Sequence, residues 1–343
     1  MIKPKLNVSF GKYTTLKLGG RAKYFFEIKN KDDIACVVDF ALSKNLRILP
    51  LGLGSNLVVS DHPKNMIVFR MMNKGIKIIK KNNDSVIIEV SAGEKWDDFV
   101  DYAIKNKLSG IEAMAGIPGT VGATPVQNVG AYGQEVKNVI KEVCGYNLKT
   151  KNFQIIKVKQ CKFSYRDSIF KHELKGKFII ESVVFRLSKK KPKIPNYLNV
   201  KSTLEFLEKK YSKKSKIELI GLAIRRIRSE KLPDYNKTPN VGSFFKNVFV
   251  SKSKYQELKK KFPDIPSFVE GRSYKIPTGW LVENVGYKGF RKKGVGVYDK
   301  NALVLVNYSS KSSKDILNLA GGIAKAVKSK FGVKIEIEPE IVS

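Results

Sequence analysis

The chain has 343 residues, of which 42% are hydrophobic; this allows two or three domains with buried cores and excludes an intrinsically disordered protein. Its formal net charge is +34, but the lysine runs at 189–191, 209–210 and 259–261 lack the interleaved aromatics and glycines of RNA-binding segments, which favours solvated surface over a nucleic-acid site. The N-terminus lacks the apolar core of a signal peptide and no window approaches the roughly 18 apolar residues of a spanning helix, so we predict a cytoplasmic protein that binds no membrane.

The N-terminal half alternates predicted helices with short apolar strands. A helix begins at Asp32, places Ile34, Val37 and Val38 on one face, and ends near Asn45. Apolar runs bounded by turn residues predict strands. These strands are 47–51, 66–71 and 86–90, with a short apolar pair at 58–59, and a second helix spans 94–107.

The C-terminal half begins with predicted strands at 139–146 and 178–187. The segment 189–199 contains two prolines, and we interpret it as a domain linker or lid. Ser312 and Asp315 have the spacing of a capping box at the start of the last helix. No internal repeat is evident, which excludes a solenoid. The remaining predicted elements are helices 202–211, 217–227 and 254–262, a last helix with the apolar stripe Ile316, Leu319, Ile323 and Val327, and strands 302–307 and 333–338.

Cysteine and histidine are too sparse to suggest metal or redox chemistry. Cys36, Cys144 and Cys161 are far apart and odd in number, which favours buried thiols in a reducing compartment. His62 and His172 have no visible partners for a metal site or a Ser-His-Asp triad, and we expect both on the surface. The sequence therefore predicts no metal site, and acid–base chemistry falls to other side chains.

Residues 116–133, here called the glycine loop, are the most informative segment of the chain. Glycine permits positive φ and close approach of another group to the backbone, while Pro118 and Pro125 fix φ between the glycines. We interpret the glycine loop as a rigid loop around a ligand; the alternative is a turn-rich connector.

A second glycine turn spans residues 52–56. Its backbone N–H groups, hydroxyl and amide can surround a pyrophosphate without adding charge. It is not a Rossmann fingerprint, because Leu57 stands where the third glycine would be, and no Gly-Lys-Ser/Thr follows as in a Walker loop. The alternative is an ordinary glycine turn.

Three polar residues are candidates for chemistry. Arg166 is notable in a lysine-rich chain because its planar fork binds a carboxylate at two points; the alternative is an ion pair with Asp167. Ser243 lies in a glycine turn beside two phenylalanines, without a nucleophile-elbow frame or an activating histidine, which favours a proton donor or hydrogen bonder. Glu340 follows Pro339 near the end of a predicted strand, and the residues alone favour a solvated terminal carboxylate over a role in chemistry.

Taken in order, these segments resemble the UDP-N-acetylenolpyruvoylglucosamine reductase (MurB) family, in particular its type I members. The resemblance implies an α/β (α+β) protein with a two-subdomain FAD-binding fold of the vanillyl-alcohol-oxidase (PCMH) type and a C-terminal α+β substrate-binding domain. It implies FAD-binding subdomains at 1–71 and 72–200 and a substrate-binding domain at 201–332, with the strand 333–343 returning to the first subdomain. The motifs that carry the resemblance are 13–20, 51–56, 116–133, 165–168, 231–234, 242–247, 279–281, 302–307 and 338–340.

The resemblance also implies an activity, the NADPH-dependent reduction of UDP-N-acetylglucosamine enolpyruvate to UDP-N-acetylmuramate in peptidoglycan precursor synthesis. In the family, hydride passes from NADPH to N5 of FAD and then to the terminal vinyl carbon. Arg166 matches the arginine that stabilises the resulting negative charge and Glu340 the glutamate that assists it, in the manner of an oxyanion hole. Ser243 matches the residue that protonates the second carbon. Only three residues follow Glu340, and we expect fraying of this short tail to weaken its placement.

The remaining site residues are implied by the resemblance alone. We expect a monomer acting on a small molecule; the alternatives are an FAD oxidase of the same fold and a basic RNA-binding protein. The implied FAD-binding residues are Gly52, Leu53, Gly54, Ser55, Asn56, Leu57, Gly116, Ile117, Pro118, Gly119, Thr120, Gly122 and Ala123, and the implied substrate-binding residues are Gln127, Tyr132, Tyr197, Arg228, Lys231 and Asn247.

Overall fold

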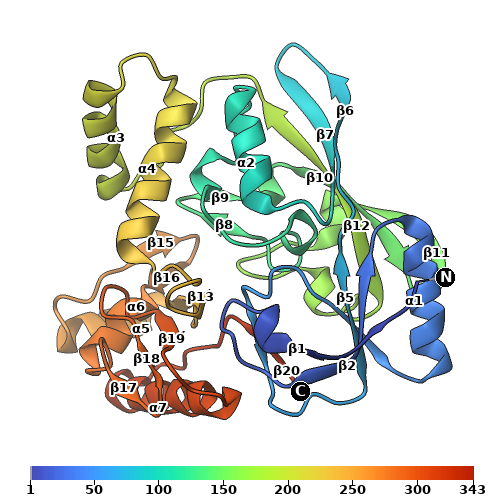
Figure 1. Cartoon of the computed structure of the whole chain (residues 1–343). Coiled ribbons are helices and arrows are strands. Elements are labelled where there is room, and N and C mark those ends of the chain that lie inside the picture. The colour runs from blue at the N-terminus through green and yellow to red at the C-terminus, as the bar shows by residue number, and fades with distance from the viewer. Residues whose placement is uncertain (1) are drawn as a thin grey trace. The chain divides into compact units, whose positions relative to one another are not determined.

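The computed structural model describes residues 2–343 (Figure 1). These residues form two compact units, each discontinuous in sequence. No helix within 2–343 is both long and apolar enough to cross a membrane. The three-domain division expected from the sequence stays a prediction. Unit 1 comprises residues 2–8, Ala22–Leu53 and Asn65–Glu230, and unit 2 comprises Ser9–Arg21, Gly54–Lys64 and Lys231–Ser343.

The first sheet of unit 1 has the strand order β1-β2-β5-β3, with β5 parallel to both β2 and β3. The helix α1 begins after Asn30, whose side chain accepts the Asp33 N–H while the Asp33 carboxylate accepts the Asn30 N–H. Its apolar face packs on the sheet through Ile34 and Val37 against Phe26 and other buried residues, which confirms the predicted helix. The elements are β1 Lys5–Ser9, β2 Arg21–Ile28, α1 Lys31–Ser43, β3 Arg47–Pro50 and β5 Met66–Met71.

The second sheet of unit 1 is antiparallel, in the order β11-β10-β12-β7-β6. The helix α2 covers it with Trp96 and Phe99, both fully buried, and the Phe99 ring lies 4.9 Å from that of Phe185. The Trp96 indole N–H donates to the Met114 carbonyl at 3.2 Å, which ties α2 to the start of the glycine loop. The elements are β6 Ile76–Lys81, β7 Ser85–Ser91, α2 Trp96–Lys105, β8 Gly130–Ala131, β9 Gln134–Glu135, β10 Ile140–Asn147, β11 Asn152–Lys157 and β12 Phe178–Ser188, with 3-10 turns η2 Glu112–Met114, η3 Val121–Ala123, η4 Val136–Asn138, η5 Val158–Cys161 and η6 Ile169–Lys171.

Two helices complete unit 1, α3 (Leu198–Lys210) and α4 (Lys216–Lys231). The helix α3 begins before the predicted residue 202. Its buried stripe starts at Val200, but Leu198 in the same turn is 88% exposed, which interrupts the apolar face at the start of the helix. A Cβ on Gly221 would lie 2.6 Å from Cδ1 of Ile104, so glycine permits the close packing of α4 against α2.

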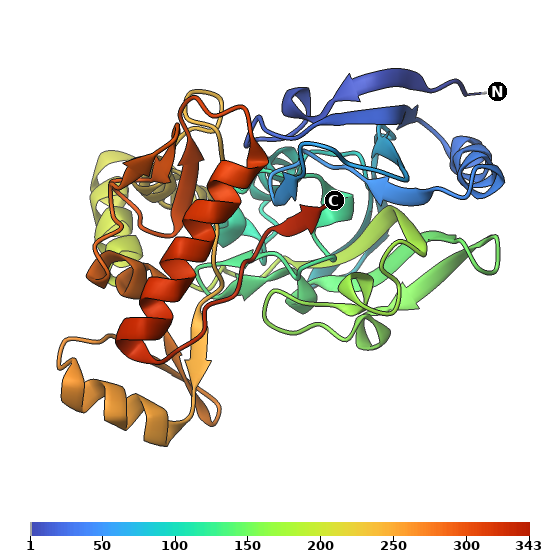
Figure 2. The ribbon, with the colours of Figure 1, turned by 90° about the horizontal axis from the view of Figure 1, so that it is seen from below.

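The main sheet of unit 2 has the order β13-β19-β18-β17, and the long helix α7 packs across it (Figure 2). The predicted stripe of α7 is buried, and Ser312 is its N-cap, accepting the Lys314 N–H. The predicted capping box is wrong: the Asp315 carboxylate accepts the hydroxyl of Ser310, which itself accepts the Ser312 N–H. The elements are β13 Asn240–Ser243, β17 Arg291–Lys292, β18 Val295–Val297, β19 Val304–Asn307 and α7 Ser313–Phe331.

A smaller three-stranded sheet of unit 2 has the order β14-β16-β15. The helix α5 begins after the N-cap Ser251, whose hydroxyl accepts the Lys254 N–H, and it confirms the helix predicted at 254–262 with a start two residues earlier. The elements are η1 Phe10–Lys12, β14 Val248–Val250, α5 Lys252–Lys261, β15 Phe268–Glu270, β16 Ser273–Ile276 and α6 Thr278–Asn284.

The predicted strand at 333–338 is wrong. Val333 and Ile335 are buried between exposed neighbours, so the alternation is real, but this segment forms only one isolated bridge, from Ile337 to Phe245. Alternation reports burial of one face, whereas a strand also needs a partner ladder. The final strand, β20 (Glu340–Val342), instead pairs in parallel with β4 (Leu57–Val59).

Asp61 holds the start of α7 within unit 2. Its carboxylate accepts the Ser312 hydroxyl at 2.6 Å and the Ser313 N–H at 2.8 Å. Burial opposes ionisation of Asp61, but the hydrogen bonds from Ser312 and Ser313 outweigh it and leave its pKa below the ordinary value.

We expect Asp61→Ala to lower the free energy of unfolding at pH 7 by about 1–2 kcal/mol, because it removes these acceptors from a helix N-terminus. A lowered native pKa contributes stability that is complete above the unfolded pKa and is lost as pH falls through the native pKa. The difference in melting temperature between the parent protein and Asp61→Ala should therefore become smaller in acid. Thermal melts at pH 7 and below pH 4 check this, with the exposed Asp39→Ala as control. A difference that grows in acid contradicts the prediction.

Candidate functional site

The start of the glycine loop in unit 1 is held by side chains from α2 and α4. The Gly116 N–H donates to Asp97 at 2.6 Å, and Nε of Arg228 donates to the Gly116 carbonyl at 3.3 Å. Asp97 also pairs with Arg225, which reaches Asp101 at 2.5 Å. Both backbone groups of Gly116, a left-handed residue with φ +74°, are thus fixed.

The two arginines of α4 differ in their surroundings although they are three residues apart and share one helix face. Burial opposes the charge of Arg225, but the carboxylates of Asp97 and Asp101 raise its pKa overall. Burial lowers the pKa of Arg228, whose guanidinium is near Tyr132. Arg225 is therefore a structural ion-pair residue, whereas Arg228 has no carboxylate that offsets its burial to the same degree.

The two glycine segments expected to bind a cofactor meet within unit 1. A Cβ on Gly52 would lie 2.8 Å from Oγ1 of Thr120, and a Cβ on Gly122 would lie 2.6 Å from Cβ of Ala92, so neither position has room for a side chain. Several backbone N–H groups here donate to no other group within residues 2–343; they belong to Gly52, Leu53, Ile117, Gly119 and Thr120. Such a set of backbone donors suits the pyrophosphate of a dinucleotide.

The rest of the first glycine turn belongs to unit 2. Gly54 has φ +61°, and a Cβ there would lie 2.5 Å from the Tyr13 carbonyl. The Asn56 carbonyl accepts the Glu340 N–H at 2.9 Å, and Leu57 pairs with Glu340 in the β4–β20 ladder. The expected fraying at Glu340 is wrong, because its backbone lies in a strand beside a predicted cofactor segment.

Three of the expected substrate residues lie together in unit 1. Tyr132 and Gly133 form the two-residue turn between β8 and β9 with φ of +49° and +83°. The Tyr132 ring meets that of Tyr197 edge to face, with 5.5 Å between centroids. Burial raises the pKa of the Tyr132 phenol, against the opposing charge of Arg228. Gln127 lies on the glycine loop between Val126 and Asn128.

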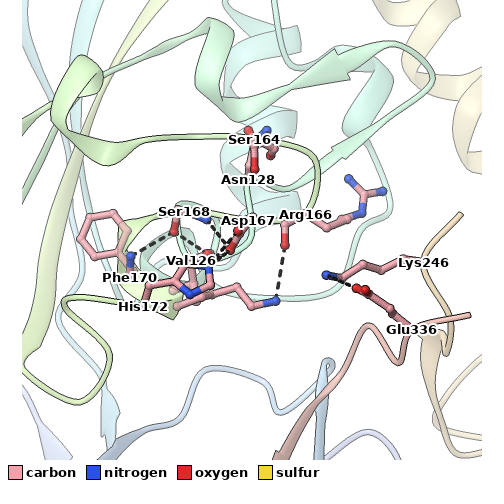
Figure 3. A network of polar contacts seen from close by, with 11 residues as sticks. Val126, Asn128, Ser164, Arg166, Asp167, Ser168, Phe170, His172, Lys246 and Glu336 are labelled. Atoms are coloured by element: carbon pink, nitrogen blue, oxygen red, sulfur yellow. Dashed lines mark hydrogen bonds and ion pairs between the residues drawn. The ribbon is translucent and has the colours of Figure 1, made fainter. Parts of the chain in front are cut away.

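Arg166 sits in a tight turn, Ser164–Asp167, whose end residues exchange backbone hydrogen bonds of 3.1 and 3.3 Å. Arg166 has φ +55°, and its Nη2 donates to the Gly130 carbonyl at 2.9 Å. The Asp167 carboxylate contacts Nε2 of His172 at 2.8 Å, and Figure 3 shows the Arg166 guanidinium directed away from this pair. His172 is exposed, as predicted, but it has a partner that the sequence did not reveal.

Ser243 ends β13 in unit 2, opposite Val304 of β19. Gly242 has φ +72°, and its N–H donates to Asn240 at 3.0 Å, which fixes the turn before the serine. Phe244 and Phe245 are buried directly after it. Ser243 itself is half-buried, so its hydroxyl stands at the edge of this apolar cluster.

Two further expected substrate residues belong to unit 2. Oδ1 of Asn247 accepts the Thr278 N–H at 3.1 Å, and the neighbouring Lys246 pairs with Glu336 at 3.2 Å (Figure 3). Lys231 is the exposed last residue of α4. Hydrogen bonding thus fixes Asn247, while Lys231 extends from a helix end.

Sequence reasoning missed Asp97 and Arg225, which hold the start of the glycine loop. Asp97 is one of two acids in the first turn of a predicted helix, and this usually indicates no more than a favourable charge near a helix N-terminus. Its partner Arg225 is 128 residues away in the chain, so no local pattern joins them.

The thiols are only partly as expected. Cys161 is buried, and burial raises its pKa to about 12. Cys36 is exposed instead, because it lies on the face of α1 opposite Ile34 and Val37. Within residues 2–343, no group of three or more His, Cys, Asp or Glu side chains could hold a metal ion.

Comparisons with known proteins cover nearly the whole chain. A family model described as "UDP-N-acetylenolpyruvoylglucosamine reductase, C-terminal domain" matches residues 233–342, and one described as "FAD binding domain" matches 22–158. The UDP-N-acetylenolpyruvoylglucosamine reductase of Flavobacterium johnsoniae is 38% identical over 98% of each chain. That of Neisseria gonorrhoeae is 39% identical over 95% of this chain and 94% of its own.

A solved structure shows the same fold. The crystal structure of the UDP-N-acetylenolpyruvylglucosamine reductase from Thermus caldophilus matches 100% of both chains with a TM-score of 0.69 at 20% sequence identity. Together with the two family models, it confirms the predicted fold class, an FAD-binding fold joined to a C-terminal domain.

Proposed function

The chain belongs to the UDP-N-acetylenolpyruvoylglucosamine reductase family, and from this we propose that it uses NADPH and FAD to reduce UDP-N-acetylglucosamine enolpyruvate to UDP-N-acetylmuramate for peptidoglycan synthesis. The observation that carries the proposal is the set of backbone N–H donors where Gly52 meets Thr120, beside glycines that leave no room for side chains. Anionic dinucleotides are held in this way, without charged side chains.

These residues fit FAD by the chemistry of their donors. We assign the pyrophosphate to the N–H groups of unit 1, with Gly116 fixed by Asp97 and Arg228. When bound, FAD supplies the hydride that the substrate receives. The residues assigned to FAD are Gly52, Leu53, Gly54, Ser55, Asn56, Leu57, Gly116, Ile117, Pro118, Gly119, Thr120, Gly122 and Ala123.

The substrate's three-carbon arm needs a cation and a proton donor. We assign the cation to Arg166, whose planar guanidinium can bind the carboxylate at two points as negative charge develops on it. Glu340, held in β20, assists this polarisation. The Ser243 hydroxyl donates the proton to the second carbon, and it needs no activating histidine because a carbanion-like carbon is a strong base.

The nucleotide part of the substrate is assigned to a mixed set of aromatic, cationic and amide side chains. Tyr197 and Tyr132 offer ring faces and edges, and Arg228 offers a half-buried cation beside them. These are groups that bind a sugar and a pyrophosphate. The full set is Gln127, Tyr132, Tyr197, Arg228, Lys231 and Asn247.

The visible spectrum of the purified protein tests this function. We expect a flavin band that falls on anaerobic addition of NADPH, more rapidly than with NADH, and that returns on addition of the enolpyruvyl nucleotide. Return of the band in air at the same rate without the nucleotide would favour the oxidase alternative. A colourless protein that binds RNA with a steep salt dependence would favour the RNA-binding alternative. The expected cytoplasmic location and monomeric state stay predictions, which cell fractionation and light scattering test.

A further inference from the structure

Hydrogen bonds within unit 1 join the glycine loop to the Arg166 turn (Ser164–Asp167) and to Ser168, which follows the turn (Figure 3). Alternate residues of the loop each take part. The Val126 carbonyl accepts the Ser168 hydroxyl at 2.6 Å, and the Gly130 carbonyl accepts Nη2 of Arg166 at 2.9 Å. Between them, the Asn128 amide donates to the Ser164 carbonyl at 2.9 Å.

Asn128 is the centre of this connection. Its side chain is fully buried, and its Nδ2 also donates to Glu135 at 3.1 Å while its Oδ1 accepts the Lys137 N–H at 3.1 Å. One amide therefore links the loop, the segment after β9 and the Arg166 turn. A buried amide whose donors and acceptor are all used fixes its neighbours strongly, since any shift leaves a polar group unsatisfied.

Both Asn128 and Arg166 have left-handed backbones, with φ of +46° and +55°. Asparagine tolerates this region, whereas for arginine it costs on the order of 1 kcal/mol. Such conformations persist only where the surroundings impose them. The Arg166 side chain is directed away from Asp167 (Figure 3), and the Asn128 amide donates to Ser164 at the start of the turn that holds Arg166 in this backbone conformation.

We propose that Asn128 is a positioning residue, which fixes the Arg166 turn so that the guanidinium meets the substrate carboxylate in one orientation. This rests on the role assigned to Arg166 under the proposed function. Arginine has up to about 2 kcal/mol of rotamer entropy to lose on binding. A turn fixed by Asn128, with Nη2 anchored on Gly130, removes much of that freedom before the substrate arrives.

The substitution Asn128→Gly removes the side-chain amide without straining the backbone, because glycine adopts positive φ freely. Asn65→Gly is the matched control: Asn65 also has positive φ, +53°, but is exposed. We expect Asn128→Gly to lower kcat about 10-fold with little change in NADPH-dependent loss of the flavin band, as for a displaced transition-state contact. We expect Asn65→Gly to match the parent protein.

Ligand binding gives a second readout that a general loss of stability would not produce. UDP-N-acetylmuramate carries the carboxylate of the three-carbon arm, whereas UDP-N-acetylglucosamine lacks the arm. Asn128→Gly should weaken binding of UDP-N-acetylmuramate about 10-fold and leave binding of UDP-N-acetylglucosamine unchanged. In a protein that already carries Arg166→Lys, Asn128→Gly should cause little further loss of binding, because the two changes act through one contact. An equal loss for both ligands, or a full further loss in that background, overturns the proposal.

Hydrogen exchange separates this proposal from the proposed function, since it requires no substrate. The N–H groups of Ser164 and Asp167 are bonded within the turn, and we expect them to exchange faster in Asn128→Gly while amides of the β10–β12 ladder stay protected. Unchanged exchange at the turn overturns the positioning role even if the enzyme is active. Should Asn128→Gly not fold, Ser168→Ala removes the neighbouring bond to Val126 and must show the same exchange and ligand discrimination, or the proposal fails.

Discussion

A Ser243→Ala protein is expected to lose its flavin band to NADPH at the parent rate and to reduce the enolpyruvyl nucleotide ~10²-fold or more slowly, as for loss of an acid catalyst. The substitution removes one hydroxyl from the end of β13 and leaves the glycine turn before it unchanged, because the Gly242 N–H is held by Asn240. The expected loss is therefore chemical rather than structural.

Single-turnover experiments divide the two steps. NADPH is mixed with the protein without nucleotide, and the nucleotide is added in a second mixing step while the flavin band is followed. Ser253→Ala is the control, since Ser253 is an exposed serine of the same unit in α5. Product formation by Ser243→Ala at the parent rate would remove the serine from its assigned role, and an equal slowing of both steps would indicate damage to FAD binding instead.

Sequence patterns predicted the elements whose signals are local. The stripe of α7 is buried as expected because a period of 3.6 residues depends only on one apolar face. The prediction for the segment 333–338 failed for the complementary reason. Val333 and Ile335 are buried by side-chain packing in unit 2, and the backbone hydrogen bonds of Glu336 and Glu338 form one isolated bridge rather than a ladder. Strand pairing depends on the tertiary fold. The sequence therefore did not reveal β20, which has only three residues and follows a proline.

The same distinction between local signals and tertiary contacts applies to the candidate site. Glycine and proline spacing revealed the glycine loop, because a glycine by itself indicates that a position needs positive φ or close approach of another group. The side chains that hold the loop were not predictable, since Asp97 meets Arg225 and Asn128 meets Ser164 only after folding. An asparagine in a loop suggests an ordinary turn, and nothing in its neighbours shows that it is fully buried.

The second large effect concerns the charge that meets the substrate carboxylate. We expect Arg166→Lys to lower kcat/KM for the enolpyruvyl nucleotide by about 10²–10³-fold, as for loss of one donor to a developing oxyanion. The net charge is kept, so attraction of the anionic substrate over long range should change little. The loss instead reflects geometry, because an ammonium group cannot contact both carboxylate oxygens in a planar fork while also reaching the Gly130 carbonyl.

Arg186→Lys is the matched control, because Arg186 is an exposed arginine of the same unit whose Nε contacts Ser85 at the edge of the β7–β12 pair. Steady-state rates measured at two salt concentrations separate the effect of the charge from the effect of the guanidinium geometry. If charge alone mattered, Arg166→Lys would retain most of its activity at low salt, where unscreened attraction is strongest. A large loss at both salt concentrations, with Arg186→Lys near the parent rate, requires the planar geometry of the guanidinium, which the strained turn at φ +55° presents.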